Sequence, residues 1–277
     1  MSGPAPAGAD GGRTVAEPAV SPDPDAFPTR TLSPWTDRFD GLAAGLTVRG
    51  RGPGGEPADF GFTTAPSAWA LHSRLEALGR QLGFPGVAVA RQVHGGSVVC
   101  LEPTPEGGVR VPGEADGLLT RGEGLLLVVT AADCVPVWLL DPGSGGLALL
   151  HGGWRGIAAG VLRAGVRAVG ARFGADPGDL RVHLGPAICG DCYEVGPEVP
   201  EALGREASGG ATRVDLRDEL AARAAGLGVA PDRLTRSSWC TRCRADQFHS
   251  HRGSGDDAGR MAAFVGWRRR PEGRPIG

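Results

Sequence analysis

The sequence contains no lysine, because all 29 of its Lys+Arg residues are arginines. A mechanism that needs a lysine amine, as a Schiff base or as a general base, is therefore excluded. Basic charge is not in excess either, since 31 acidic residues give a formal net charge of −2. Proteins that bind nucleic acid or an anionic membrane surface usually carry a basic patch, so we expect neither partner.

Long hydrophobic runs are also missing from the chain. No apolar segment approaches the roughly 20 residues that span a bilayer. The first residues lack the charged-then-apolar pattern of a secretion signal. We therefore expect a cytoplasmic protein whose six cysteines remain reduced and are available for catalysis or metal binding.

The composition favours one folded domain between two polar ends. The 277 residues are 41% hydrophobic, which supports a real core, and 47 glycines and 23 prolines indicate many turns. Residues 1 to about 30 are rich in Ala, Pro, Gly and Asp, so we expect a disordered tail there. No internal repeat or domain boundary is evident. We expect a single folded domain over residues 40–267 and a flexible tail over residues 268–277.

The most informative stretch runs from residue 125 to residue 156. It holds three short apolar runs, residues 125–130, 135–140 and 147–150, which are interrupted by polar or turn residues. Continuous apolar runs of this length indicate strands that are buried on both faces. Cys134 lies between the first two runs, and His151 directly follows the third. The sequence thus predicts that a thiol and an imidazole leave neighbouring strands.

The remaining apolar patterns predict strands that alternate with a few helices. The helices are expected at residues 68–82, 155–172 and 214–227, and further strands at residues 180–184, 234–239 and 261–267. Residues 87–90 are expected to form a strand that leads to His94, with residues 97–101 as its hairpin partner. The fold class is therefore α/β (α+β), with a mixed β-sheet core and outer helices in one domain.

Three residues that follow buried strands could bind one metal ion. His94, Cys134 and His151 offer two imidazole nitrogens and one sulfur, and catalytic zinc commonly takes three protein ligands with one position left open. The alternative is a buried free cysteine with two hydrogen-bonded histidines. Either interpretation is compatible with the sequence pattern alone.

Two pairs of cysteines form a second candidate. Cys189 and Cys192 make one Cys-x-x-Cys pair, and Cys240 and Cys243 make another, with 47 residues between the two pairs. Zinc ribbons usually separate such pairs by about 15–20 residues. These residues are therefore either a structural zinc site or loop cysteines near the rim of the active site.

A basic cluster lies near the end of the chain and includes Arg252. Arginine guanidinium groups bind phosphate or carboxylate with two parallel hydrogen bonds, so the cluster could be an anion pocket. The alternative is a solvated loop. The members of the cluster are Arg242, Arg244, His249, His251, Arg252 and Arg260.

Seven short motifs occur in order along the chain. They are QVHG (92–95), ADGLLT (115–120), TAADCVPV (130–137), HGGWRG (151–156), GPAICGDCYEVG (185–196), CTRC (240–243) and GRMAAF (259–264). Together they resemble the YfiH-type family, also called the multicopper polyphenol oxidase or laccase-domain family, over roughly residues 40–267. The resemblance implies a layered sandwich related to the catalytic domain of cytotoxic necrotizing factors. It also implies that the metal ligands are His94, Cys134 and His151.

The resemblance implies a zinc-dependent enzyme that acts on purine nucleosides. Its expected reactions are phosphorolysis of adenosine, inosine, guanosine or methylthioadenosine, and deamination of adenosine, so the expected partners are a purine nucleoside and phosphate. Cys134, His151 and Asp133 are the expected catalytic residues. The candidates for binding substrate or phosphate are Arg74, Arg155 and Arg252.

Three other functions stay open at this point. Cys134 and His151 could be the nucleophile and base of a hydrolase that acts on peptidoglycan precursors, a role linked to some members of the family. A copper polyphenol oxidase is less favoured, and Cu²⁺ with it, because multicopper oxidases need many histidine ligands and the chain has only 6. A zinc-binding protein without enzymatic activity would need no substrate pocket.

Overall fold

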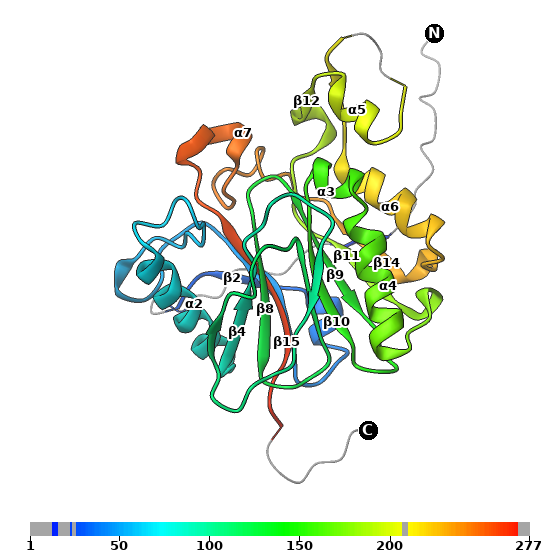
Figure 1. The fold of residues 1–277 in the computed structure, drawn as a ribbon. Helices are drawn as coiled ribbons and strands as arrows, with labels where there is room; N and C mark the ends of the chain where they lie inside the picture. Colours follow the sequence, from blue (N-terminus) through cyan, green and yellow to red (C-terminus); the bar gives the residue numbers. More distant parts are fainter. Residues whose placement is uncertain (1–12, 16–22, 24–25, 207–209, 271–277) are drawn as a thin grey trace.

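Two mixed β-sheets pack face to face, and helices cover both outer faces (Figure 1). The computed structural model describes residues 13–15, 23, 26–206 and 210–270. None of the described helices is long and apolar enough to cross a membrane. The α-helices are α1 (Ser33–Thr36), α2 (Ala68–Leu82), α3 (Trp154–Ala158), α4 (Val161–Phe173), α5 (Glu198–Ala202), α6 (Leu216–Gly226) and α7 (His251–Ser254).

The first sheet has six strands in the order β2-β3-β15-β8-β4-β6. Strands β4 and β8 are parallel, as are β4 and β6, and the other neighbours are antiparallel. The bounds are β2 (Thr29–Thr31), β3 (Leu42–Thr47), β15 (Met261–Trp267), β8 (Leu125–Ala131), β4 (Gly86–Val89) and β6 (Gly108–Arg110).

The second sheet has seven strands in the order β1-β14-β11-β9-β10-β7-β5. From β11 through β9 and β10 to β7, each strand is antiparallel to the next, and the pairs toward both edges are parallel. The bounds are β1 (Arg13–Val15), β14 (Leu234–Ser237), β11 (Arg181–Leu184), β9 (Val135–Leu140), β10 (Leu147–Gly152), β7 (Gly117–Thr120) and β5 (Val98–Cys100). A separate small ribbon pairs β12 (Glu194–Val195) with β13 (Thr212–Arg213).

The three apolar runs of the central stretch are buried strands, as the sequence predicts. In β8, Leu125 and Leu127 face the second sheet, while Leu126 and Val128 face the helical side. Because successive side chains of a strand point to opposite faces, a strand between two apolar layers needs apolar residues at every position. The indole Nε1 of Trp138 joins the sheets by donating a hydrogen bond to the Phe264 carbonyl at 2.9 Å.

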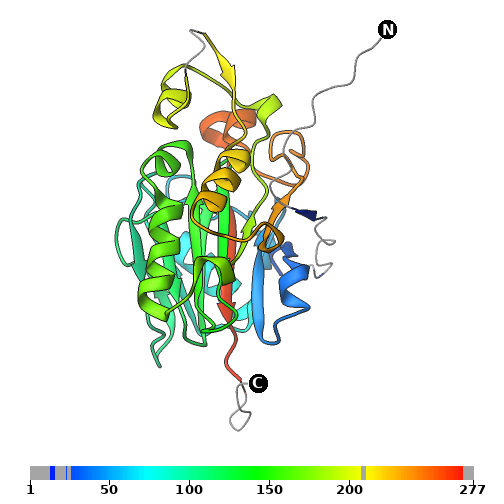
Figure 2. The ribbon, with the colours of Figure 1, turned by 90° about the vertical axis from the view of Figure 1, so that its right-hand side faces the viewer.

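Helix α2 covers the outer face of the six-stranded sheet. Helices α4 and α6 cover the outer face of the seven-stranded sheet, and both helices face the viewer in Figure 2. The bounds expected for α2 are confirmed: the Ser67 hydroxyl caps its first turn, and Gly83 ends it at φ 82°. The single helix expected at residues 155–172 is instead two helices, α3 and α4. Gly160 breaks the helix because its φ is 84°, which a right-handed helix does not allow.

One expectation about pairing was wrong. Residues 97–101 are not the hairpin partner of the strand before His94, because β5 pairs with β7 in the other sheet. Within residues 1–30, where a disordered tail is expected, the structure describes β1, which pairs with β14, and the start of β2, which pairs with β3. The rest of residues 1–25, apart from residue 23, and residues 271–277 lie outside the described part of the chain.

The burial of Phe27 provides a test of where the folded domain begins. Its ring is 1% exposed and meets Phe60 edge-on, with ring centroids 5.0 Å apart. We predict that Phe27→Ala lowers the free energy of unfolding by about 3–5 kcal/mol, because loss of the buried ring leaves a cavity in the core. Denaturant unfolding measures this change. The control is Phe62→Ala, whose side chain is 40% exposed; equal effects of both substitutions would place Phe27 outside the core.

Candidate active site

The structure brings together the three residues that the sequence singles out as metal ligands. His94 follows β4 of one sheet, His151 belongs to β10 of the other, and Cys134 lies where the chain crosses from β8 to β9. Their ligand atoms all lie within 4.8 Å of one another. His151 is buried, Cys134 is partly buried and His94 is exposed, so the group opens to solvent on one side.

A buried carboxylate holds two of these residues in place. Asp116 is fully buried, and its Oδ1 accepts a hydrogen bond from His151 Nδ1 at 3.0 Å. Because a carboxylate only accepts, we assign the proton to Nδ1, which leaves His151 Nε2 free for a metal. The same carboxylate accepts from the backbone N–H groups of Val93, His94 and Gly95 at 2.6–3.2 Å. The ADGLLT motif contains Asp116, but sequence reasoning gave this residue no role.

Local backbone strain marks the same place. Among the described residues other than glycine, only His94 (φ 58°) and Asp133 (φ 89°) have positive φ. Such conformations cost about 1–3 kcal/mol and persist where the surroundings impose them. His94 is itself a candidate metal ligand and Asp133 directly precedes another, Cys134, which ties the strain to the site.

The carboxylate of Asp133 is occupied by two interactions with the protein. Its Oδ1 accepts a hydrogen bond from the Thr241 hydroxyl at 2.6 Å, and its Oδ2 accepts from the backbone N–H of Arg252 at 2.7 Å. The expected catalytic residue Asp133 therefore joins the Cys134 loop to two later segments, of which the one that holds Arg252 borders the cavity. This arrangement favours a positioning role over proton transfer.

Without a metal, the site favours a thiolate and an imidazolium. Burial alone would raise the pKa of the Cys134 thiol, but the charge of His151 and hydrogen bonds from His151 and His94 outweigh it and lower the pKa to about 6. Burial alone would lower the pKa of His151, but Cys134 and Asp116 raise it to about 9. Burial would also raise the pKa of Asp116, yet its hydrogen bonds hold that pKa below the usual value.

A cavity of about 570 Å³ opens beside these residues. This volume lies within the usual range for small-molecule sites. Its wall combines the three candidate ligands with four arginines, three large aromatic side chains and a third histidine. The arginines, aromatic residues and histidine are Arg91, Arg155, Arg252, Arg260, Phe62, Trp154, Tyr193 and His251.

The structure separates the three arginines that were expected to bind substrate or phosphate. Arg155 and Arg252 border the cavity, but Arg74 does not. Arg74 is 4% exposed, pairs with Glu56 at 3.3 Å and donates to the Asp59 carbonyl at 2.7 Å. The structure therefore places Arg74 outside this cavity, with its guanidinium used in packing α2 against the preceding loop.

Comparisons with known proteins agree with the fold and the ordered motifs. The family described as multi-copper polyphenol oxidoreductase laccase matches residues 49–268. A purine nucleoside phosphorylase of Streptomyces coelicolor is 36% identical over 241 residues, which are 83% of this chain and 97% of that protein. An adenosine deaminase from an unknown prokaryotic organism is 36% identical over 156 residues, 52% of this chain and 59% of that one.

A solved structure agrees with the architecture. The crystal structure of YlmD from Geobacillus stearothermophilus superposes with a TM-score of 0.77 at 29% sequence identity. The match covers 89% of this chain and 100% of that chain. The α/β layered sandwich expected from the sequence is therefore confirmed, with two mixed sheets in its core.

Gly153 provides a steric test of the candidate metal site. A Cβ at this position would lie 3.0 Å from Cys134 Sγ and 3.0 Å from His94 Cδ2, although the φ of −79° is ordinary. We predict that Gly153→Ala folds but holds metal more weakly, by about 10-fold or more, because a shifted ligand is poorly oriented. Competition with a chromogenic chelator measures the affinity. The control is Gly226→Ala, where a Cβ would meet nothing within 4 Å; unchanged affinity in Gly153→Ala would contradict the site.

The lowered pKa of Cys134 predicts how its reactivity depends on pH. In metal-free protein, alkylation of Cys134 should rise as pH increases through about 6 and level off above that, because the thiolate is the nucleophile. Cys100 should react only at alkaline pH, since burial raises its pKa. Peptide mapping after iodoacetamide treatment distinguishes the two thiols. A midpoint for Cys134 near that of an ordinary thiol would show that His151 does not pair with it.

Proposed function

The chain belongs to the multi-copper polyphenol oxidoreductase laccase family, and from this premise we propose that it is a zinc-dependent purine nucleoside enzyme. We propose phosphorolysis of adenosine, inosine, guanosine or methylthioadenosine, with deamination of adenosine as a second reaction. The names of the relatives, a purine nucleoside phosphorylase and an adenosine deaminase, support both reactions. The observation that carries the proposal is one cavity that combines a His-Cys-His set with arginine guanidinium groups and aromatic walls.

Arg155 is the first candidate for binding phosphate. Among the described residues, no hydrogen bond or ion pair occupies its guanidinium, which lies 4.1 Å from the ring centroid of Trp154. Stacking on an aromatic ring fixes the plane of the group and leaves its N–H donors available for an anion. Arg252 donates one N–H to the Glu194 carbonyl at 2.8 Å and keeps further donors toward the cavity.

Trp154 and Tyr193 suit the purine. Flat aromatic side chains on a cavity wall bind a planar base by stacking, and a phenol adds a hydrogen-bond donor. Burial raises the pKa of Tyr193 to about 12, so its hydroxyl stays protonated near neutral pH. A protonated phenol can donate to a purine nitrogen that gains electron density as the glycosidic bond breaks. We assign that stabilising role to Tyr193.

The three ligands fit zinc by their chemistry and spacing. A tetrahedral zinc ion would place nitrogen and sulfur ligands about 3.3–3.8 Å apart, within the 4.8 Å spread observed here. Asp116 orients His151 as carboxylates do in zinc sites. When bound, the metal supplies Lewis-acid chemistry. A multicopper centre is poorly supported, because only His94, His151 and His251 of the 6 histidines border the cavity.

One observation favours a second candidate function. The Cys134 thiolate and the His151 imidazolium form the nucleophile–acid pair of a cysteine hydrolase when no metal is bound. That function gives no role to His94, whose backbone N–H is held by the same carboxylate as His151. The metal-dependent nucleoside enzyme therefore remains the better-supported proposal.

The proposal predicts distinct products in a nucleoside assay. With adenosine, inosine, guanosine or methylthioadenosine, free base should appear only when phosphate is added, whereas ammonia should form from adenosine without phosphate. Arg155→Ala should raise the KM for phosphate about 10-fold or more, because a charge-assisted hydrogen bond is lost. The control is Arg163→Ala on the exposed side of α4. Chromatography of the bases and an ammonia assay measure both reactions.

Metal removal separates this proposal from the hydrolase. Chelation should abolish both nucleoside reactions, and added zinc should restore them. Full activity in metal-free protein, lost on alkylation of Cys134, would instead assign the chain to the cysteine hydrolases. Phosphorolysis that does not respond to Arg155→Ala would remove this residue from the phosphate site.

A further inference from the structure

The two Cys-x-x-Cys pairs meet because their strands are neighbours. Residues 189–192 follow β11, and residues 240–243 follow β14, which lies parallel to β11 in the seven-stranded sheet. The carboxyl ends of parallel strands lie at the same edge of a sheet, so the loops that follow them are adjacent. An isolated parallel bridge between Ala187 and Cys240 extends the pairing up to the first thiol of the second pair.

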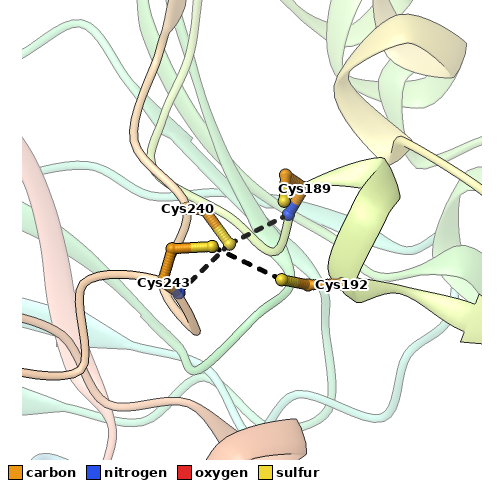
Figure 3. Close-up of side chains that lie close together, drawn as sticks. All are labelled: Cys189, Cys192, Cys240 and Cys243. Carbon is orange, nitrogen blue, oxygen red and sulfur yellow. Dashed lines mark hydrogen bonds between the residues drawn. The ribbon is translucent and has the colours of Figure 1, made fainter.

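The four thiols converge on one point from two sides (Figure 3). Their sulfur atoms all lie within 4.8 Å of one another, and the Sγ atoms of Cys192 and Cys243 are 3.4 Å apart. A tetrahedral zinc ion with four sulfur ligands at about 2.3 Å would hold them about 3.8 Å apart. A disulfide would need about 2.05 Å between two sulfurs. The observed arrangement is thus close to that of a metal centre.

Backbone donors already point at the sulfur nearest the core. The N–H groups of Cys189 and Cys243 donate to Cys240 Sγ at 3.3 and 3.4 Å, as the dashed lines in Figure 3 show. Hydrogen bonds to a sulfur stabilise its thiolate form, which is the form that binds metal. Each donor belongs to a residue that supplies another of the four thiols, so the two loops interlock around one position.

We propose that these residues form a second metal centre, a structural zinc site with four thiolate ligands. The site is separate from the His-Cys-His group and does not depend on the proposed function. Four protein ligands leave no open position for substrate, which is the pattern of structural zinc rather than catalytic zinc. The ligands are Cys189, Cys192, Cys240 and Cys243.

This centre supports the wall of the active-site cavity. Tyr193 directly follows Cys192 and borders the cavity, and Thr241 directly follows Cys240 and donates its hydroxyl to Asp133. Each of the two loops therefore carries one residue that contacts the candidate active site. A metal bound to both loops would fix Tyr193 on one loop relative to Thr241, and through Thr241 to Asp133.

Zinc counts in matched variants test the proposal. Wild-type protein purified with zinc should hold one ion in each centre. The double variant His94→Ala/His151→Ala should keep one ion, and Cys192→Ser/Cys243→Ser should lose the ion that the first variant keeps. Cys100→Ser, which removes a thiol outside the cluster, should hold both ions. Elemental analysis provides the counts, and an unchanged count in Cys192→Ser/Cys243→Ser would overturn the proposal.

Cobalt spectroscopy identifies the ligands even if the double cysteine variant does not fold. With Co²⁺ in the His94→Ala/His151→Ala protein, we expect intense sulfur-to-cobalt charge-transfer bands and the visible bands of tetrahedral cobalt. The single variant Cys243→Ser, at the most exposed ligand, should weaken and shift these bands. The absence of thiolate bands would overturn the proposal. A disulfide between Cys192 and Cys243, found by mass spectrometry of the freshly purified protein, would assign the cluster to redox chemistry instead.

Thermal unfolding supplies a readout that is independent of any activity. Binding to the folded state alone stabilises a protein by mass action. A chelator should therefore lower the Tm of the His94→Ala/His151→Ala protein, which lacks the other centre. When Cys192→Ser and Cys243→Ser are added to this protein, the chelator should leave its Tm unchanged, because neither centre then keeps its ligands. An unchanged Tm in the first protein would contradict a structural role, whatever the nucleoside assays show.

Discussion

The hydrogen bonds of the Asp116 carboxylate connect the two sheets at the place where chemistry can occur. The carboxylate precedes β7 of one sheet and accepts from three successive N–H groups of the loop that follows β4 of the other. It also accepts from His151 on β10, and the Asp116 carbonyl accepts from the His151 backbone N–H at 2.7 Å. A buried charge without partners strongly destabilises the folded state, so the fully buried Asp116 carboxylate needs these hydrogen bonds to offset the cost of its burial. The positions of His94 and His151 follow from one residue.

The crossing from β8 to β9 completes the site because it brings a thiol between the sheets. Asp133 adopts φ 89° in this crossing, a conformation that is unfavourable for any residue with a Cβ. Its two hydrogen bonds, to Thr241 and to the backbone of Arg252, offset that cost and hold the turn. The backbone conformation of Asp133 thus sets the position of the next residue, Cys134, close to His94 and His151. The same contacts connect the crossing to the segments that hold Thr241 and Arg252.

The sequence predicts this protein well where burial sets a pattern, and poorly where pairing depends on distant partners. The runs at β8, β9 and β10 are apolar on both faces, so their strands were predictable. An apolar pattern does not reveal which sheet a strand joins, and β5 was assigned to the wrong partner. Helix α2 was predictable from its leucines, but the helical spacing continues through Gly160, so the break there was not. Asp116 shows that a motif can contain a residue without revealing its contacts.

The number of residues between the two cysteine pairs did not predict that the four cysteines lie together. The 47 residues between Cys192 and Cys240 exceed the spacing of a zinc ribbon, yet they contain α5, β13, α6 and β14, which return the chain to the strand beside β11. A crossover connection through a helix normally has this effect in a parallel strand pair. The spacing rule for zinc ribbons describes short hairpins, whereas here the sheet supplies the closure. Cysteine pairs that follow parallel strands with a helical crossover between them can therefore share a metal across a long insertion.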